Sequence, residues 1–234
     1  MYLYETHLHT APVSRCAGAS VAETLCYYQS LGYAGVFITN HFIDGNINTD
    51  RALPYEDRIR FFFSDYEEGV IIGKKLGISV FPGVEMSYGG TDFLVYGPDR
   101  EWYLAHPEIE NMRKSALLPY LIEEGALVIH AHPFREASYI DHIRLFPRCV
   151  HGTEIYNACR KEFENRLAAQ YAENYGLLSF AGSDNHCAGG LTTLGGMMTE
   201  QPIANTREFI DAVLSGAAKP FRRDADGTVQ MLGI

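Results

Sequence analysis

Side chains that could bind a metal ion recur along this sequence, each time at the end of an apolar run. His7 and His9 end the first such run, and residues two apart on a strand point to the same side. His130 and His132 repeat this spacing after residues 127–129, so we expect these two imidazoles to share a side as well. One His-x-His pair is commonly an ordinary polar face. Its recurrence favours a metal site.

The remaining candidates also follow predicted strands. They are His41, Glu85, Glu154, Asp184 and His186. Six of the 9 histidines of the chain therefore lie at strand ends, which ordinary polar residues would not be expected to do. A mixed set of imidazoles and carboxylates suits Zn²⁺, Mn²⁺ or Fe²⁺, whereas Mg²⁺ prefers ligands that are all oxygen.

The elements that must position these residues alternate between strand and helix. Glycines such as Gly77 and Gly176 separate a helical stretch from a β-rich run, and Ser20-x-x-Glu23 predicts a capped helix start. About eight β-rich runs are expected, at 2–9, 34–40, 78–84, 92–96, 126–130, 150–156, 177–181 and 194–199. This alternation predicts an α/β fold with a single distorted TIM-like barrel of seven or eight β/α units, or, as the alternative, an open doubly wound sheet. In a barrel, active sites lie at the carboxyl ends of the strands, where the candidate ligands are. We expect the barrel to span residues 1–222, with a loosely attached tail at 223–234.

The composition excludes several classes of partner. The 234 residues carry 19 basic and 29 acidic side chains, a formal charge of −10, with no basic run, so duplex nucleic acid is not an expected partner. No apolar stretch approaches the roughly 20 residues of a membrane helix, and the first residues do not resemble a secretory leader, so we expect a cytoplasmic protein. The five cysteines are widely spaced and odd in number, which predicts reduced thiols.

The order of six motifs resembles the polymerase and histidinol phosphatase (PHP) family of metal-dependent phosphoesterases. The motifs are His7-x-His9, Ile38-Thr39-Asn40-His41, Gly83-Val84-Glu85, His132-Pro133, Glu154-x-x-Asn157 and Gly182-Ser183-Asp184-x-His186. The resemblance implies a distorted α/β barrel with two or three divalent ions that hydrolyses phosphate esters. By position, His7, His9, Glu85 and Asp184 would hold the first ion, and Glu85 would bridge to a second at His132. His41 and His186 would belong to a third.

The sequence departs from the family pattern at several positions. Asn40 replaces an acidic residue, and Asp92 stands where the family has a ligand histidine, so either Asp92 or His130 would complete the second site. Residues 10–18 lack the His or Asp that completes the third site and offer Ser14, Arg15 and Cys16 instead. A third ion is therefore left open.

The family chemistry needs no nucleophile from the protein, because two metal ions can hold a bridging hydroxide. Glu85 and Asp184 would serve catalysis by holding these ions. The leaving group would be protonated by a metal-bound water, or by His186 if the third site is empty. Arg135, Arg15 and Arg160 are the candidate binders of an anionic substrate. We expect a histidinol-phosphatase-like enzyme for a small phosphomonoester. The alternatives are a nucleotide phosphoesterase or exonuclease, or a catalytically weak metal-binding regulatory protein. The oligomeric state is left open.

Overall fold

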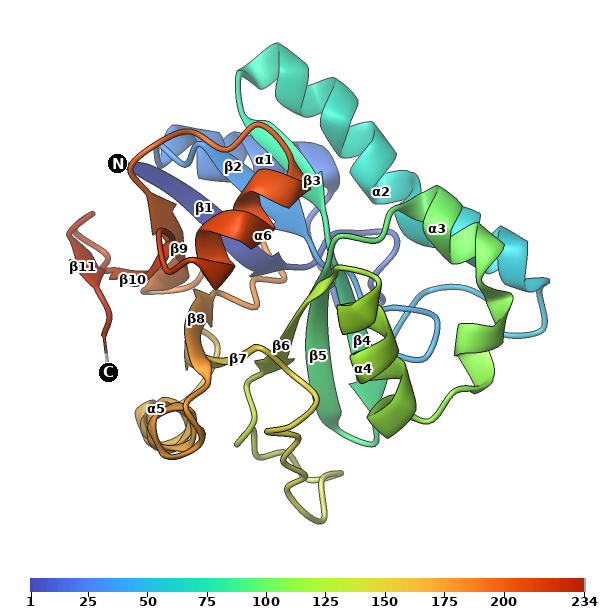
Figure 1. The fold of residues 1–234 in the computed structure, drawn as a ribbon. Helices are drawn as coiled ribbons and strands as arrows, with labels where there is room; N and C mark the ends of the chain where they lie inside the picture. Colours follow the sequence, from blue (N-terminus) through green and yellow to red (C-terminus); the bar gives the residue numbers. More distant parts are fainter. Residues whose placement is uncertain (234) are drawn as a thin grey trace.

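Two β-sheets form the frame of the protein in the computed structural model, which describes residues 1–233 (Figure 1). The first sheet has the strand order β11-β10-β9-β1-β2-β3 and the second the order β4-β5-β6-β7-β8. The strands are β1 (Tyr2–Leu8), β2 (Gly35–Ile38), β3 (Ser79–Pro82), β4 (Val84–Tyr88), β5 (Thr91–Tyr96), β6 (Leu127–Ala131), β7 (Gly152–Asn157), β8 (Leu178–Gly182), β9 (Leu194–Thr199), β10 (Lys219–Arg223) and β11 (Val229–Met231).

Six α-helices and one short 3₁₀ helix cover the outside of these sheets. The helices are α1 (Val21–Ser30), α2 (Tyr55–Leu76), α3 (Arg100–Ala105), η1 (Pro107–Asn111), α4 (Lys114–Glu123), α5 (Glu162–Tyr175) and α6 (Thr206–Leu214). The predicted cap at Ser20 is present: its hydroxyl accepts from the backbone N–H of Glu23, whose carboxylate accepts from the backbone N–H of Ser20. Gly77 and Gly176 end α2 and α5 in the left-handed conformation, as predicted. None of the helices within residues 1–233 is long and apolar enough to span a bilayer.

The α/β class is confirmed, but the expected closed barrel is not found. Within residues 1–233 neither sheet closes on itself. The single run predicted at 78–84 is two strands in the structure: β3 pairs with β2, and β4 pairs with β5, on either side of Gly83. A hairpin turn at Gly89 and Gly90, both with positive φ, makes β4 and β5 antiparallel. The chain therefore passes from one sheet to the other here.

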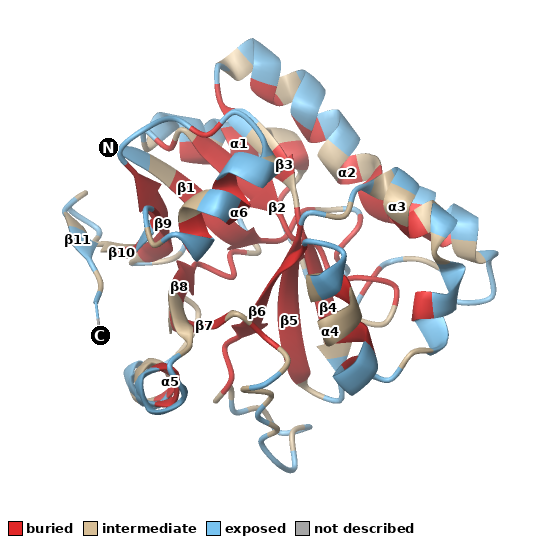
Figure 2. Cartoon of the chain, viewed as in Figure 1, coloured by how far each residue is buried: buried red, intermediate tan, exposed pale blue. Residues whose placement is uncertain are grey.

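The two sheets pack together through an aromatic core. Phe37 of the first sheet and Tyr96 of the second have ring centroids 5.2 Å apart, and the hydroxyl of Tyr96 donates to the carbonyl of Thr6 at 2.7 Å. Phe209 of α6 covers this core, with its ring 4.3 Å from that of Phe37. Figure 2 shows the strands largely buried and the outer faces of the helices exposed. The core therefore fixes the ends of both sheets relative to each other.

The segment expected to be a loose tail extends the first sheet. The predicted boundary at 222/223 falls inside β10, which is antiparallel to β9, and β11 pairs with β10 at the edge. The backbone N–H of Leu232 also donates to the carbonyl of Pro220. The turn Asp224–Gly227 that precedes β11 explains the turn-like composition there.

Candidate metal centre

The candidate ligands come from both sheets and meet where the sheets adjoin. His7 lies on β1 and His9 just after it, whereas Glu85 lies on β4. His41 follows β2, and an isolated β-bridge joins it to Glu85 across the two sheets. Asp184 follows β8 with a φ of +56°, an uncommon value for a residue other than glycine. The ends of the strands therefore bring together residues that are far apart in the sequence.

A buried cluster of nitrogen and oxygen atoms results. Nε2 of His7 lies 3.3 Å from Oε1 of Glu85, and Nε2 of His9 lies 3.3 Å from Oε2 of the same carboxylate. Nε2 of His9 also lies 3.3 Å from Oδ1 of Asp184. Nε2 of His132 lies 3.2 Å from Oε1 of Glu85. Two sets of possible ligands share this space: His7, His9 and Asp184, and His7, Glu85 and His132. The sequence prediction placed all five residues together, and the structure does so.

The outer ring nitrogens of the two β1 histidines are already engaged. Nδ1 of His7 lies 2.9 Å from Oε1 of Glu154, and Nδ1 of His9 lies 3.0 Å from the hydroxyl of Ser14. A histidine that binds a metal commonly donates its other N–H to such a partner, which leaves the Nε2 lone pair for the ion. Both rings are therefore oriented as metal ligands would be.

Glu154 holds the cluster in place from behind, which differs from its predicted role as a ligand. Its second oxygen accepts from the backbone N–H of His132 at 2.9 Å and from the side chain of Asn157 at 3.0 Å. Because both oxygens are used in this way, Glu154 orients His7 and His132. The alternating pattern places Glu154 near the site but does not indicate which atoms it contacts.

The polar atoms of the cluster suit a cation. Among residues 1–233, Oε2 of Glu85 is buried and makes no hydrogen bond. The Nε2 atoms of His7 and His9 face each other at 3.3 Å, so at most one of them can carry a proton in that contact. A buried polar atom left without a partner is costly, and a divalent ion bound to Glu85 and to these two nitrogens would provide the missing partner. The residues present therefore fit a metal.

Electrostatic interactions in the cluster oppose the effect of burial. Burial lowers the pKa of His7, but the charges of Glu154, Asp184 and Glu85 outweigh it and raise the pKa well above its usual value. Burial raises the pKa of Glu85, yet the positive charges of His41 and His7 hold it well below its usual value. Carboxylates that retain a proton on a buried imidazole in this way also attract a metal cation, so metal and proton compete for His7.

His9 differs from His7 in charge. Burial and the positive charges of His41 and His186 lower the pKa of His9 to about 3. Its imidazole is therefore neutral at physiological pH, which is the form that binds metals.

The prediction that His130 shares a side with His132 is wrong. The ring of His130 stacks on Phe93 at 5.1 Å and meets the edge of Phe146 at 6.3 Å, on the opposite face of the second sheet. β6 ends at Ala131, and His132 adopts a φ of +25°, so the alternation of a regular strand does not extend to it.

Asp92, the other candidate for the second site, does face the cluster. Its Oδ2 lies 4.0 Å from Nε2 of His132 and 2.8 Å from Nη2 of Arg135. The carboxylate is thus already paired with a guanidinium.

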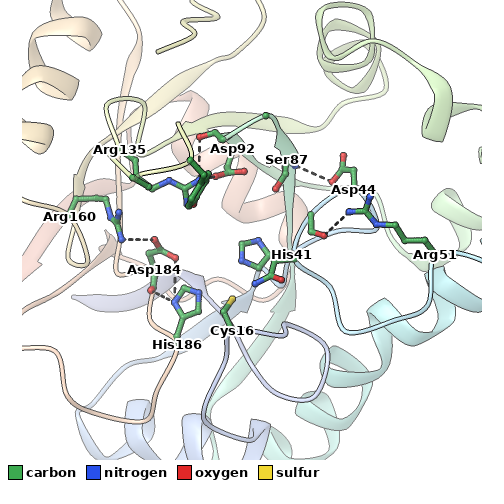
Figure 3. Close-up of a pocket in the computed structure, with 16 residues that line it drawn as sticks. Cys16, His41, Asp44, Arg51, Ser87, Asp92, Arg135, Arg160, Asp184 and His186 are labelled. Carbon is green, nitrogen blue, oxygen red and sulfur yellow. Dashed lines mark hydrogen bonds and ion pairs between the residues drawn. The ribbon is translucent and has the colours of Figure 1, made fainter. Parts of the chain in front are cut away.

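A cavity of about 650 Å³ opens above the cluster (Figure 3). Arg135 and Arg160 line it as predicted, and Nη2 of Arg160 lies 3.9 Å from Oδ2 of Asp184. Arg15 is exposed and lies outside the lining, whereas Arg51 of the loop between β2 and α2 lines the cavity. Arg51 is not among the predicted site residues. Its position in a loop that follows a ligand-bearing strand is the signal in the sequence that could have identified it.

The mouth of this cavity carries His41, His186 and Cys16. Burial lowers the pKa of His186, but hydrogen bonds with Cys159 and Cys16 and the charge of Asp184 raise it to about 10. Burial raises the pKa of the Cys16 thiol, yet hydrogen bonds with His186 and His41 outweigh this and lower it to about 6. The thiol of Cys16 therefore interacts with both histidines at the mouth of the cavity.

Comparisons with known proteins agree with the motif-based resemblance. Residues 162–218, which include Asp184 and His186, match a family model described as PHP-associated. No curated protein matches the chain.

Several solved structures share the fold. A two-domain protein of Bacteroides vulgatus containing a predicted PHP-like metal-dependent phosphoesterase is 14% identical with a TM-score of 0.66, covering 94% of this chain. This chain spans 64% of that protein's length. An amidohydrolase of Chromobacterium violaceum, solved with sulfate and no metal, is 14% identical with a TM-score of 0.54, covering 92% of this chain and 96% of its own. A protein of Bifidobacterium adolescentis thought to be a metal-dependent phosphoesterase is 11% identical, with a TM-score of 0.56, covering 91% of this chain and 95% of its own.

Proposed function

We infer that this chain belongs to the PHP family of metal-dependent phosphoesterases, and we propose that it hydrolyses a small phosphomonoester. The observation that carries the proposal is the buried set of His7, His9, Glu85, His132 and Asp184 at the floor of a cavity lined by arginines. Divalent ions held by these residues would supply Lewis-acid activation of the phosphate and of the attacking water. Zn²⁺, Mn²⁺ and Fe²⁺ suit this donor set.

The charges of the cavity favour an anionic substrate once metal is bound. Asp44, Asp92 and Asp184 line it together with Arg51, Arg135 and Arg160, so the three acids and three arginines balance formally. Each divalent ion then makes the cavity positive. Arg135 and Arg160 present guanidinium groups that can hold phosphate oxygens through charge-assisted hydrogen bonds.

The size and lining of the cavity favour a small molecule over a nucleic acid. About 650 Å³ lies within the range typical of small-ligand sites. Single-stranded nucleic acid is usually bound on aromatic side chains, and here Tyr28, Phe62 and Phe63 are buried in helix packing. Tyr139 is the aromatic residue of the lining. Sulfate in the Chromobacterium structure is consistent with a tetrahedral oxyanion in this fold.

A phosphatase screen tests this proposal. Sugar, amino-alcohol and nucleotide monophosphates and a short oligonucleotide would be compared with Mn²⁺ or Zn²⁺ added. We expect a monophosphate to have the highest kcat/KM, and the Glu85→Gln variant to be inactive because an amide cannot carry the charge that two ions share. His142→Gln, at an exposed histidine, is the matched control. A preference for the oligonucleotide would favour a nuclease, and no turnover would favour a regulatory protein.

The role of Arg135 can be tested on the same substrate. Arg135→Ala should lower kcat/KM roughly ten- to a hundredfold, the loss of one charge-assisted hydrogen bond, with bound metal unchanged. Arg144→Ala is the matched control, because Arg144 is outside the cavity lining and its guanidinium donates to the carbonyl of Gly89. Equal kinetics in the two variants would show that Arg135 serves only to pair with Asp92.

A further inference from the structure

The mouth of the cavity holds a third group of possible metal ligands. The ring centroids of His41 and His186 each lie 4.3 Å from that of His9, and one nitrogen from each of these three rings lies within 4.8 Å of the others. Figure 3 shows the sulfur of Cys16 directed toward the rings of His41 and His186. These four side chains must be divided between this group and the central cluster.

His9 belongs to the central cluster. Its Nδ1 is engaged by Ser14, and its Nε2 lies 3.3 Å from both Oε2 of Glu85 and Oδ1 of Asp184. An imidazole has only these two nitrogens, so neither is free for an ion at the mouth. The mouth retains the imidazoles of His41 and His186.

Each of these two imidazoles has one nitrogen turned toward the protein. Nδ1 of His186 lies 2.8 Å from the carbonyl of Asp184, to which it donates. Nδ1 of His41 lies 2.6 Å from Oε2 of Glu85, an ion-pair contact without hydrogen-bond geometry. These contacts leave Nε2 of each ring as the donor atom toward an ion. Two nitrogen ligands need a third partner to make a tight site.

We propose that Cys16 is this third ligand, and that Cys16, His41 and His186 form a zinc-selective site at the mouth of the cavity. Thiolate is a soft ligand that favours Zn²⁺ over Mn²⁺ and Mg²⁺. The positive charge of a metal ion favours the thiolate, so a coordinating thiol releases its proton to solvent. Cysteine and histidine are the usual zinc ligands in proteins, and three such ligands would hold the ion while leaving it accessible to water or substrate. The proposal rests on the proposed metal centre but not on the reaction.

Two other cysteines lie close enough to compete. The sulfur of Cys159 donates to the carbonyl of Asp184 at 3.2 Å and interacts with His186. Cys187 is exposed and follows His186 directly in the chain. Cys16 lines the cavity beside both imidazoles (Figure 3), whereas Cys159 and Cys187 are not part of the lining, and this position distinguishes Cys16. Cys159→Ser and Cys187→Ser are therefore the matched controls for Cys16→Ser.

Cobalt substitution tests the ligand directly and needs no turnover. The purified protein, depleted of metal and loaded with Co²⁺, should show an ultraviolet sulfur-to-cobalt charge-transfer band together with visible d–d bands. Cys16→Ser should lose the charge-transfer band and keep d–d bands from the central cluster, whereas both control variants should keep the charge-transfer band. Loss of the band in Cys159→Ser instead would overturn the assignment to Cys16.

The wild-type spectrum alone separates the two proposals. Visible d–d bands without a charge-transfer band would overturn the Cys16 site and leave the central metal centre intact. No bound cobalt at all would overturn both. These readings do not depend on whether Cys16→Ser folds.

A harder ligand at this position should change the metal preference. Cys16→Asp keeps a negatively charged ligand but replaces sulfur with oxygen. When Zn²⁺ and Mn²⁺ compete, the ratio of bound Zn²⁺ to bound Mn²⁺ should therefore fall by on the order of tenfold, as measured by metal analysis. The same Zn²⁺ to Mn²⁺ ratio in wild type and Cys16→Asp would contradict zinc selection by the thiolate. Cys187→Asp serves as the control.

Discussion

At the scale of single residues, Glu154 controls the metal centre without reaching it. Its carboxylate accepts from Nδ1 of His7 and from the backbone of His132. Glu154→Gln should weaken metal affinity about 10- to 100-fold, because an amide holds the Nδ1 proton of His7 less firmly. Titration with Zn²⁺ against a chromogenic chelator measures this. Glu164→Gln is the control, since within the described residues this buried carboxylate accepts from the backbone N–H groups of residues 136 and 161 and does not contact the cluster. Equal affinities would contradict the orienting role.

Glu5 is a second buried carboxylate beneath the site, and it makes stability depend on pH. Burial raises its pKa from 4.5 to about 7, although N–H groups of His7 and Ser183 and the hydroxyl of Tyr28 bind it. At a pH between these two pKa values, Glu5 holds a proton in the folded protein and releases it in the unfolded chain. The free energy of unfolding should therefore fall as pH rises from about 4.5 to about 7, by on the order of 3 kcal/mol.

The Glu5→Gln variant isolates this contribution. Its amide oxygen can still accept from the backbone, but it cannot titrate. Urea unfolding at about pH 5 and about pH 8 should show a smaller loss of stability in the variant than in the wild type. Parallel losses in both proteins would mean that other groups produce the pH dependence.

At the scale of elements, contact between β8 and β1 depends on a residue without a side chain. A Cβ added at Gly182 would lie 2.6 Å from Cβ of His7 and 2.7 Å from Oε1 of Glu154. Gly182→Ala should therefore separate β8 from β1, destabilise the fold by about 1–3 kcal/mol and weaken metal binding. Gly176→Ala is the control, because a Cβ added there would contact no other atom. The variant should lose only about 1 kcal/mol of stability, from the strain of a left-handed backbone, and its metal affinity should be unchanged. Unchanged metal affinity in Gly182→Ala would contradict this contact.

Local sequence patterns predicted the elements better than their pairing. Strand and helix positions follow from apolar runs, glycines and caps, and these are local properties. The hairpin of β4 and β5 could not be recognised, because its first strand continues the apolar run of β3 across Gly83. Likewise, the position of His130 depends on where β6 stops and on the φ of His132, which spacing alone does not reveal. The candidate ligands that lie at regular strand ends come together in the structure as the sequence predicts.

At the scale of the whole molecule, bound metal should contribute to stability. The ligands join the two sheets, so an ion binds the folded state and not the unfolded chain. At a free metal concentration about 100 times Kd this contributes about 2.7 kcal/mol. Exhaustive chelation should therefore lower Tm by about 5–10 °C and abolish activity. Scanning calorimetry before and after chelation, with Zn²⁺ added back, measures this. An unchanged Tm would mean that the cluster does not hold metal.

The placement of β1 also governs biosynthesis. β1 pairs with β2 on one side and with β9 on the other, and the hydroxyl of Thr6 donates to the carbonyl of Ala181. One partner of β1 is thus synthesised much later than β1 itself, and Asp184 emerges long after His7. A nascent chain cannot complete the central cluster before Asp184 has left the ribosome and β8 has packed beside β1. Until then, His7 and His9 can bind an ion only without the carboxylate of Asp184.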